Sequence, residues 1–149
     1  LPTELPSPMQ ERVRELGGEY GATTGRPRRC GWFDAVVVRY AARVNGLTGL
    51  AVTKMDVLDT LDELRIAVRY RAEGHELDDF PGDLGLLAAA EPVYETLPGW
   101  KTSTAEARTW DELPENARRY LERIEALTET PVWYVSVGTR RDQIIHVER

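Results

Sequence analysis

The sequence contains one cysteine, two histidines and no long apolar segment. The single cysteine, Cys30, excludes an internal disulfide and is typical of a reducing compartment, so we expect a cytoplasmic protein. No run of residues approaches the roughly 18 apolar residues that a membrane span needs. His75 and His146 have no cysteine or carboxylate at ligand spacing, so no metal site is expected in this chain.

Lysine is scarce as well, since Lys54 and Lys101 are the only lysines among 19 cationic residues, and the net charge is −6. An acidic chain repels nucleic acid and anionic membranes, so neither is an expected partner. The phosphate-binding pattern Gly-x-x-x-x-Gly-Lys-Ser/Thr is absent as well. The chain begins at Leu1 instead of methionine, so we expect a segment of a longer protein.

Composition and periodicity nevertheless predict one folded α/β unit of 149 residues. Apolar positions at helical spacing predict helices over 7–16, 35–45 and 114–128, with Ser7 and Asp34 as caps of the first two. Apolar and alternating runs predict strands over 50–53, 65–70, 91–97, 132–137 and 143–147. This order indicates part of a larger, mostly parallel sheet with packing helices and a small antiparallel excursion.

Three further expectations concern particular segments. The helix over 35–45 is apolar on most faces, which predicts deep burial. Residues 59–64 should form a short turn or helical piece. Residues 78–85 should form a loop, since Pro81, Gly82 and Gly85 are breakers.

The first segment that carries chemistry is Ala22-Thr23-Thr24-Gly25-Arg26-Pro27-Arg28. Guanidinium groups bind carboxylates and phosphates bidentately, and threonine hydroxyls and backbone amides add donors. Glycine lets the backbone approach a ligand, and proline limits the freedom of the loop. The segment therefore indicates an anion site, and the alternative is a solvated basic turn.

The second segment is Lys54-Met55-Asp56, which follows the apolar run 50–52. An aspartate carboxylate can accept from both N1–H and the exocyclic amine of guanine. A lysine two residues away can cover the base with its aliphatic stem. Open α/β sheets bind ligands at the carboxyl ends of strands, which favours a guanine site over a merely polar strand end.

A third segment, Ser136-Val137-Gly138, is also the end of a strand that runs into a glycine turn. Its backbone groups could contact the edge of a base if this strand end lies near Asp56. Alone, the segment would not indicate a site.

These residues, in this order and spacing, resemble the carboxy-terminal third of the adenylosuccinate synthetase family. Further segments resemble blocks of that family along nearly the whole chain. They are 2–5, 21–26, 31–32, 53–59, 94–100 and 123–125. The resemblance implies that residues 1–149 form the carboxy-terminal lobe of such an enzyme.

The family joins IMP and L-aspartate to give adenylosuccinate, GDP and phosphate, with GTP as co-substrate and Mg²⁺ as cofactor. By resemblance, Ala22 to Arg28 form the aspartate loop, with Arg26 also contacting IMP and Arg28 also reaching GTP. Lys54, Met55 and Asp56 would hold guanine together with the turn at 136–138. The parent enzyme is expected to be a homodimer.

Two positions depart from the family pattern, since Pro27 stands where arginine is frequent and Val137 replaces a threonine. The catalytic aspartate and histidine, the phosphate loop and the Mg²⁺ ligands of the family have no match in this chain. We therefore expect no catalytic residue and no metal ligand here, and no turnover by the chain alone. The alternatives are a free-standing guanine-nucleotide-binding module without catalysis and a lobe with no ligand competence.

Overall fold

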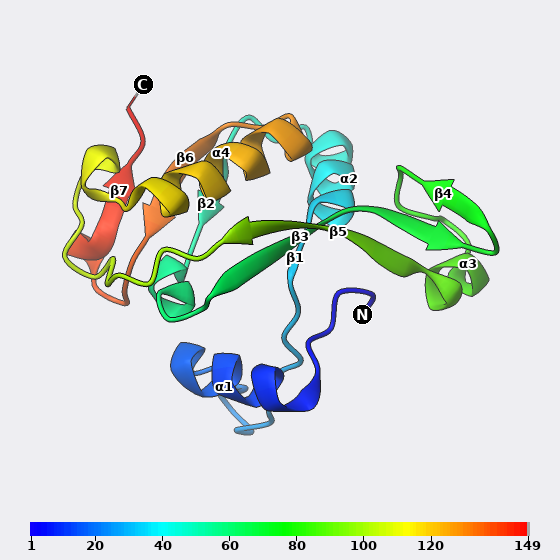
Figure 1. Cartoon of the computed structure of the whole chain (residues 1–149), viewed down its shortest axis with the longest axis horizontal. Coiled ribbons are helices and arrows are strands. Elements are labelled where there is room, and N and C mark those ends of the chain that lie inside the picture. Colours follow the sequence, from blue (N-terminus) through cyan, green and yellow to red (C-terminus); the bar gives the residue numbers. More distant parts are fainter. Residues whose placement is uncertain (149) are drawn as a thin grey trace.

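Strand β3 (Glu63–Ala72) is the central strand of one sheet in the computed structural model, which describes residues 1–148. It pairs in parallel with β1 (Phe33–Asp34) and antiparallel with β4 (His75–Leu77) and β5 (Glu91–Pro98). The long β3–β5 ribbon runs through the middle of the molecule in Figure 1. It forms the predicted antiparallel excursion.

A second sheet contains β2 (Leu50–Val52), β6 (Val132–Ser136) and β7 (Ile144–His146). β2 and β6 are parallel neighbours, whereas β7 is antiparallel to β6. The strands thus form two small mixed sheets, and the α/β fold class is confirmed.

Four α-helices accompany the sheets in the part of the chain that the structure describes, and none of them is long and apolar enough to cross a bilayer. They are α1 (Ser7–Gly17), α2 (Ala35–Asn45), α3 (Leu84–Ala89) and α4 (Glu115–Thr128). Short 3₁₀ turns η1, η2 and η3 cover Met55–Leu58, Trp110–Glu112 and Arg141–Gln143.

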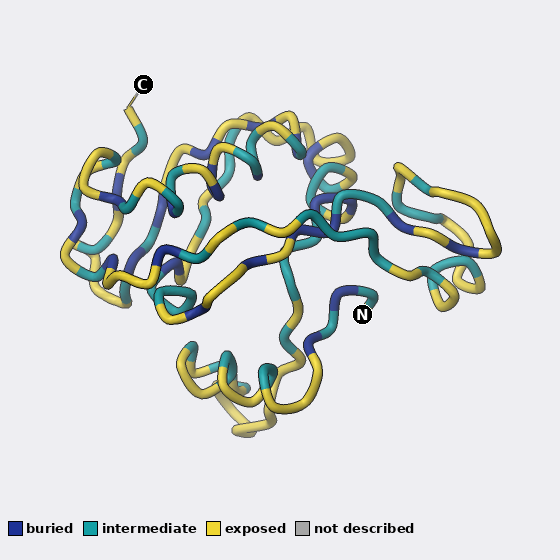
Figure 2. The backbone as a smooth tube through the Cα atoms, in the orientation of Figure 1, coloured by how far each residue is buried: buried dark blue, intermediate teal, exposed yellow. Residues whose placement is uncertain are grey.

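The core lies where α4 covers the second sheet, as the buried segments in Figure 2 show. The α4 side chains at 117, 121 and 124 are fully buried, at the spacing of one helix face. They belong to one cluster with Val132, Val135 and Ile145 of the strands. Helix α1 has no buried residue and lies at the edge of the molecule in Figure 1.

The predicted cap of α2 is confirmed. One oxygen of Asp34 accepts from the amides of Val36 and Val37 at 3.1 and 3.2 Å, and the other accepts from the Tyr70 hydroxyl at 2.5 Å. Burial raises the pKa of Asp34, which the hydrogen bond from Tyr70 opposes. The helix ends at Gly46, whose φ of +62° suits glycine.

The predicted cap of α1 is wrong. Pro6 occupies the cap position without a side-chain hydrogen bond, and the hydroxyl of Ser7 donates to Glu11 at 3.0 Å instead. The side-chain amide of Gln10 donates to the Leu5 carbonyl at 3.0 Å. The fixed φ of proline already prepares the first turn, so no side-chain cap is needed.

Two boundaries also differ from the prediction. Residues 59–60 form the expected turn, but the 3₁₀ helical piece lies before it, at η1, and β3 already begins at Glu63. The segment 78–85 is a loop only to Asp83, which caps α3 by accepting from the amide of Leu86 at 2.8 Å. The short strands β1 and β4 were not predicted, because two or three residues give no periodicity.

The expected deep burial of α2 is wrong as well. Ala35, Val36 and Ala42 are buried, but Tyr40 and Val44 keep 40% and 61% of their surface exposed. The helix packs mainly against β3 and α4, and the ring of Tyr40 also meets that of Phe80 at 5.4 Å. Part of its apolar surface therefore remains exposed to solvent.

Gly99 is a position where backbone packing demands glycine. A Cβ there would lie 1.9 Å from the carbonyl oxygen of Leu61, which belongs to the backbone and cannot rotate away. We expect Gly99→Ala to lower the free energy of unfolding by about 1–3 kcal/mol, as overpacking does. Gly82→Ala is the matched control, because nothing lies within 4 Å of its Cβ. Equal urea midpoints for the two variants would contradict this.

Candidate functional site

The parallel pairing of β2 and β6 brings two predicted site segments to one sheet edge. Val52 is the register partner of Val135, so the residues after each strand lie at neighbouring carboxyl ends. Thr53 and Ser136 line the same cavity, which has a volume of about 370 Å³. The strand end at Thr53 and the start of the third segment at Ser136 are therefore neighbours.

The side chains of Lys54, Met55 and Asp56 lie in different environments. Lys54 adopts φ +61°, a left-handed conformation that is uncommon for a residue with a side chain. Met55 is 1% exposed and belongs to the core. Within residues 1–148, no side chain or amide forms a hydrogen bond or ion pair with the half-buried Asp56 carboxylate. Its four lone-pair sites can therefore accept from a ligand.

The turn at 136–138 offers mainly backbone groups. The Ser136 hydroxyl donates to the Gly138 carbonyl at 2.9 Å, and the Val137 amide donates to the Gln143 carbonyl at 3.0 Å. The Val137 side chain is fully buried, so it cannot face a ligand as the hydroxyl of threonine could. A Cβ on Gly138 would lie 2.1 Å from Oε1 of Gln143, so a larger residue there would displace the end of the Gln143 side chain.

Residues 20–28 form a short hairpin, called the hairpin below. Tyr20 and Pro27 are bridge partners, and the Gly21 amide donates to the Arg26 carbonyl at 2.8 Å. The Gly25 amide donates to the Gly21 carbonyl at 2.8 Å, and Gly25 has φ +65°. Every residue from 22 to 28 is exposed. The loop thus has its own backbone hydrogen bonds while its side chains stay accessible.

The arginines of the hairpin differ in their partners. Across residues 1–148, no carboxylate pairs with Arg26. Arg28 donates through Nη1 to Oε2 of Glu19 at 3.0 Å, and Lys54 donates to the other oxygen of Glu19. Glu19 was not among the predicted site residues, although it lies directly between the Gly17–Gly18 pair and the hairpin.

A cavity of about 400 Å³ lies between the hairpin, α1 and η1. Glu19, Arg28 and Lys54 line its polar part, while Trp32 and Met55 belong to its apolar wall. Ligand pockets commonly combine apolar walls with a few convergent polar groups. The hairpin and Lys54 therefore border one cavity.

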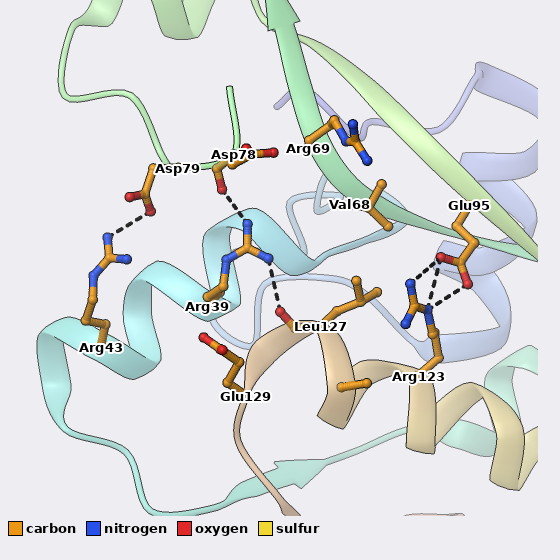
Figure 3. A pocket seen from close by; sticks show the side chains of 11 residues that line it. Arg39, Arg43, Val68, Arg69, Asp78, Asp79, Glu95, Arg123, Leu127 and Glu129 are labelled. Atoms are coloured by element: carbon orange, nitrogen blue, oxygen red, sulfur yellow. Dashed lines mark hydrogen bonds and ion pairs between the residues drawn. The ribbon is translucent and has the colours of Figure 1, made fainter. Parts of the chain in front are cut away.

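A second group of arginines lines a cleft of about 510 Å³ between α2, α4 and β3 (Figure 3). There Arg123 forms two hydrogen bonds of 2.8 Å and one of 3.0 Å with Glu95. Arg39 donates to the Leu127 carbonyl, in the last turn of α4, at 3.0 Å. These cations already have protein partners, which favours the hairpin with Arg26 as the anion site.

Comparison with known proteins decides the family. The sequence profile described as adenylosuccinate synthetase matches residues 1–145. The chain belongs to the adenylosuccinate synthetase family. It is 56% identical over 149 residues to the adenylosuccinate synthetase of Carboxydothermus hydrogenoformans, covering 100% of this chain and 35% of the relative. The corresponding identity for Trichlorobacter lovleyi is 53% over 148 residues, covering 99% and 34%.

A solved structure agrees with this assignment. The fully ligated adenylosuccinate synthetase from Plasmodium falciparum has a TM-score of 0.95 and 37% identity, covering 99% of this chain and 36% of that one. The chain thus spans about a third of the length of the family members it matches.

The two cationic partners of Glu19 change the pKa of its carboxyl group. The hydrogen bond from Lys54, then that from Arg28, lowers the pKa of Glu19 below its ordinary value of 4.5, against the effect of burial. The charged form is favoured in the folded state, so this contribution to stability is present above pH 4.5. It is lost as the pH falls through the lowered pKa.

We expect Lys54→Met to raise the pKa of Glu19 towards 4.5, because methionine keeps the stem and removes the ammonium. Carbon-13 NMR titration of the Glu19 carboxyl measures this directly. A pKa unchanged by the substitution would contradict the contact.

Proposed function

We propose that residues 1–149 are the carboxy-terminal lobe of a GTP-dependent ligase that joins IMP and L-aspartate. The products would be adenylosuccinate, GDP and phosphate. Membership of the family supports this, together with one observation, the adjacency of the strand ends at Thr53–Asp56 and Ser136–Gly138. The proposal extends to a cytoplasmic, homodimeric parent enzyme.

In this proposal Asp56 recognises guanine. Its carboxylate would accept from N1–H and the exocyclic amine, and its lack of a partner within residues 1–148 leaves it available. The Lys54 stem would cover the base, while the buried Met55 fixes both neighbours in place. Backbone groups of the 136–138 turn would contact the other edge of the base.

The hairpin would bind the anionic substrate. Arg26, Thr23 and Thr24 would hold the carboxylates of aspartate, with Arg26 also contacting IMP. Arg28 would reach GTP from the base of the hairpin. Ala22, Gly25 and Pro27 would shape the loop without donating a side chain.

Phosphoryl transfer would depend on residues outside this sequence. Mg²⁺ neutralises charge on the transferring phosphoryl group in such reactions. We assign no Mg²⁺ ligand to this chain and place the ligands in another part of the enzyme. The role of this chain would be to position the base and the amino acid.

The Asp56→Asn variant tests the assignment of the guanine site. Asparagine presents a donor where aspartate presents only acceptors, so we expect GTP affinity to fall roughly 10-fold or more. XTP should bind better than GTP, because the exocyclic oxygen of xanthine accepts from the new amide. Isothermal calorimetry with GTP, XTP and ATP measures all three affinities.

Asp79→Asn is the matched control, since it removes one carboxylate from the charged cleft of Figure 3. Its GTP affinity should equal that of the unmodified chain. Binding of GTP and ATP with equal affinity, or loss of GTP binding in both variants, would refute the role of Asp56.

The 149-residue chain alone should give no adenylosuccinate from IMP, L-aspartate, GTP and Mg²⁺, because the phosphate loop is not in its sequence. Chromatography of the reaction mixture detects the product. Turnover above the protein-free control would show that this chain contains the catalytic groups.

A further inference from the structure

The C-terminus of α1 places Glu19 without help from a ligand. Gly18 adopts φ +59°, which turns the chain so that the Glu19 amide donates to the Arg14 carbonyl at 2.9 Å. The Glu19 carbonyl accepts from the Arg28 amide at 2.9 Å, which closes the base of the hairpin. Cγ of Glu19 lies beside Gly17, since a Cβ built there would be 3.3 Å away. The backbone hydrogen bonds of Glu19 thus fix the position from which its side chain extends.

The two carboxylate oxygens of Glu19 have different partners. Oε2 accepts from Arg28, and Oε1 accepts from the Lys54 ammonium, which also donates to the Gly17 carbonyl at 2.7 Å. The Glu19 side chain is 22% exposed, against 55% for Arg28 and 45% for Lys54. One largely covered carboxylate thus joins the hairpin to the segment Thr53–Asp56.

We propose that Glu19 is a positioning residue that couples the hairpin to Thr53–Asp56, so that a ligand at either segment changes the other. This rests on the proposed function only for the identity of the ligands. The coupling itself follows from the shared carboxylate and exists in the free chain.

The direction of the coupling follows from charge. A base that stacks on the Lys54 stem fixes the ammonium and, through Glu19, fixes Arg28 and the hairpin. By linkage, each ligand then changes the affinity of the other by the same factor.

A double-mutant cycle tests the coupling without any ligand. Amide hydrogen exchange of Gly21 and Gly25 reports opening of the hairpin, since both amides donate within it. We expect Lys54→Met, on the other segment, to speed this exchange roughly two- to five-fold, the size expected for a largely exposed ion pair. In the Glu19→Gln background the same substitution should change nothing further.

Glu15→Gln is the matched control, because it removes an exposed carboxylate from the same helix and has no side-chain partner within residues 1–148. Its hairpin should exchange as in the unmodified chain. The proposal would be overturned if Lys54→Met speeded exchange of Gly21 and Gly25 equally in the unmodified chain and in Glu19→Gln. It would also be overturned if Lys54→Met left that exchange unchanged in the unmodified chain.

A second arm separates this inference from the proposed function. GDP should slow exchange of Gly21 and Gly25 in the unmodified chain but not in Glu19→Gln. If GDP binds neither chain while the cycle is non-additive, the guanine site is wrong and the coupling stands. If GDP binds both chains and slows exchange of Gly21 and Gly25 equally in each, the coupling through Glu19 is wrong and the guanine site stands.

Discussion

The parallel pairing of β2 with β6 is the constraint on which the candidate site depends. It joins segments that are distant in the sequence and aligns Val52 with Val135. Val132, Val135 and Val137 are buried in the core that α4 covers, so hydrophobic packing fixes the register. A slip of one residue would turn Val135 outwards and carry Ser136 away from Thr53.

Local charge, and not net charge, determines what the site attracts. The chain carries −6 overall, yet one exposed loop contains Arg26 and Arg28. Most of the other arginines within residues 1–148 are held by partners, as Arg123 is by Glu95. Most surface pairs contribute less than about 1 kcal/mol each, so their main effect here is to leave few cations free for a ligand.

The sequence predicted the elements that follow from periodicity and capping. Helices α2 and α4 were predicted within one residue, and Asp34 caps α2 as expected. The site segments were also recognisable, because glycine, arginine and Lys-x-Asp patterns are local. Whether these segments lie close together could not be predicted, since strand pairing depends on packing between residues far apart in the chain.

What could not be predicted depended on distant neighbours. The role of Glu19 depends on Lys54, which no spacing rule connects to it. The exposure of Val44 on α2 reflects a helix whose apolar surface is only partly covered, which its sequence does not reveal. The short strands β1 and β4 exist because β3 pairs with them, and their own residues carry no strand signal.

Nitrogen-15 NMR mapping with guanosine 5′-monophosphate would test the central claim most directly, with adenosine 5′-monophosphate as the comparison. The account predicts shifts for guanosine that concentrate at the amides of 53–56 and 136–138, at the neighbouring ends of β2 and β6. Adenosine should produce no such pattern. Equal shifts with both nucleotides, or guanosine shifts centred on the charged cleft of Figure 3, would contradict the account.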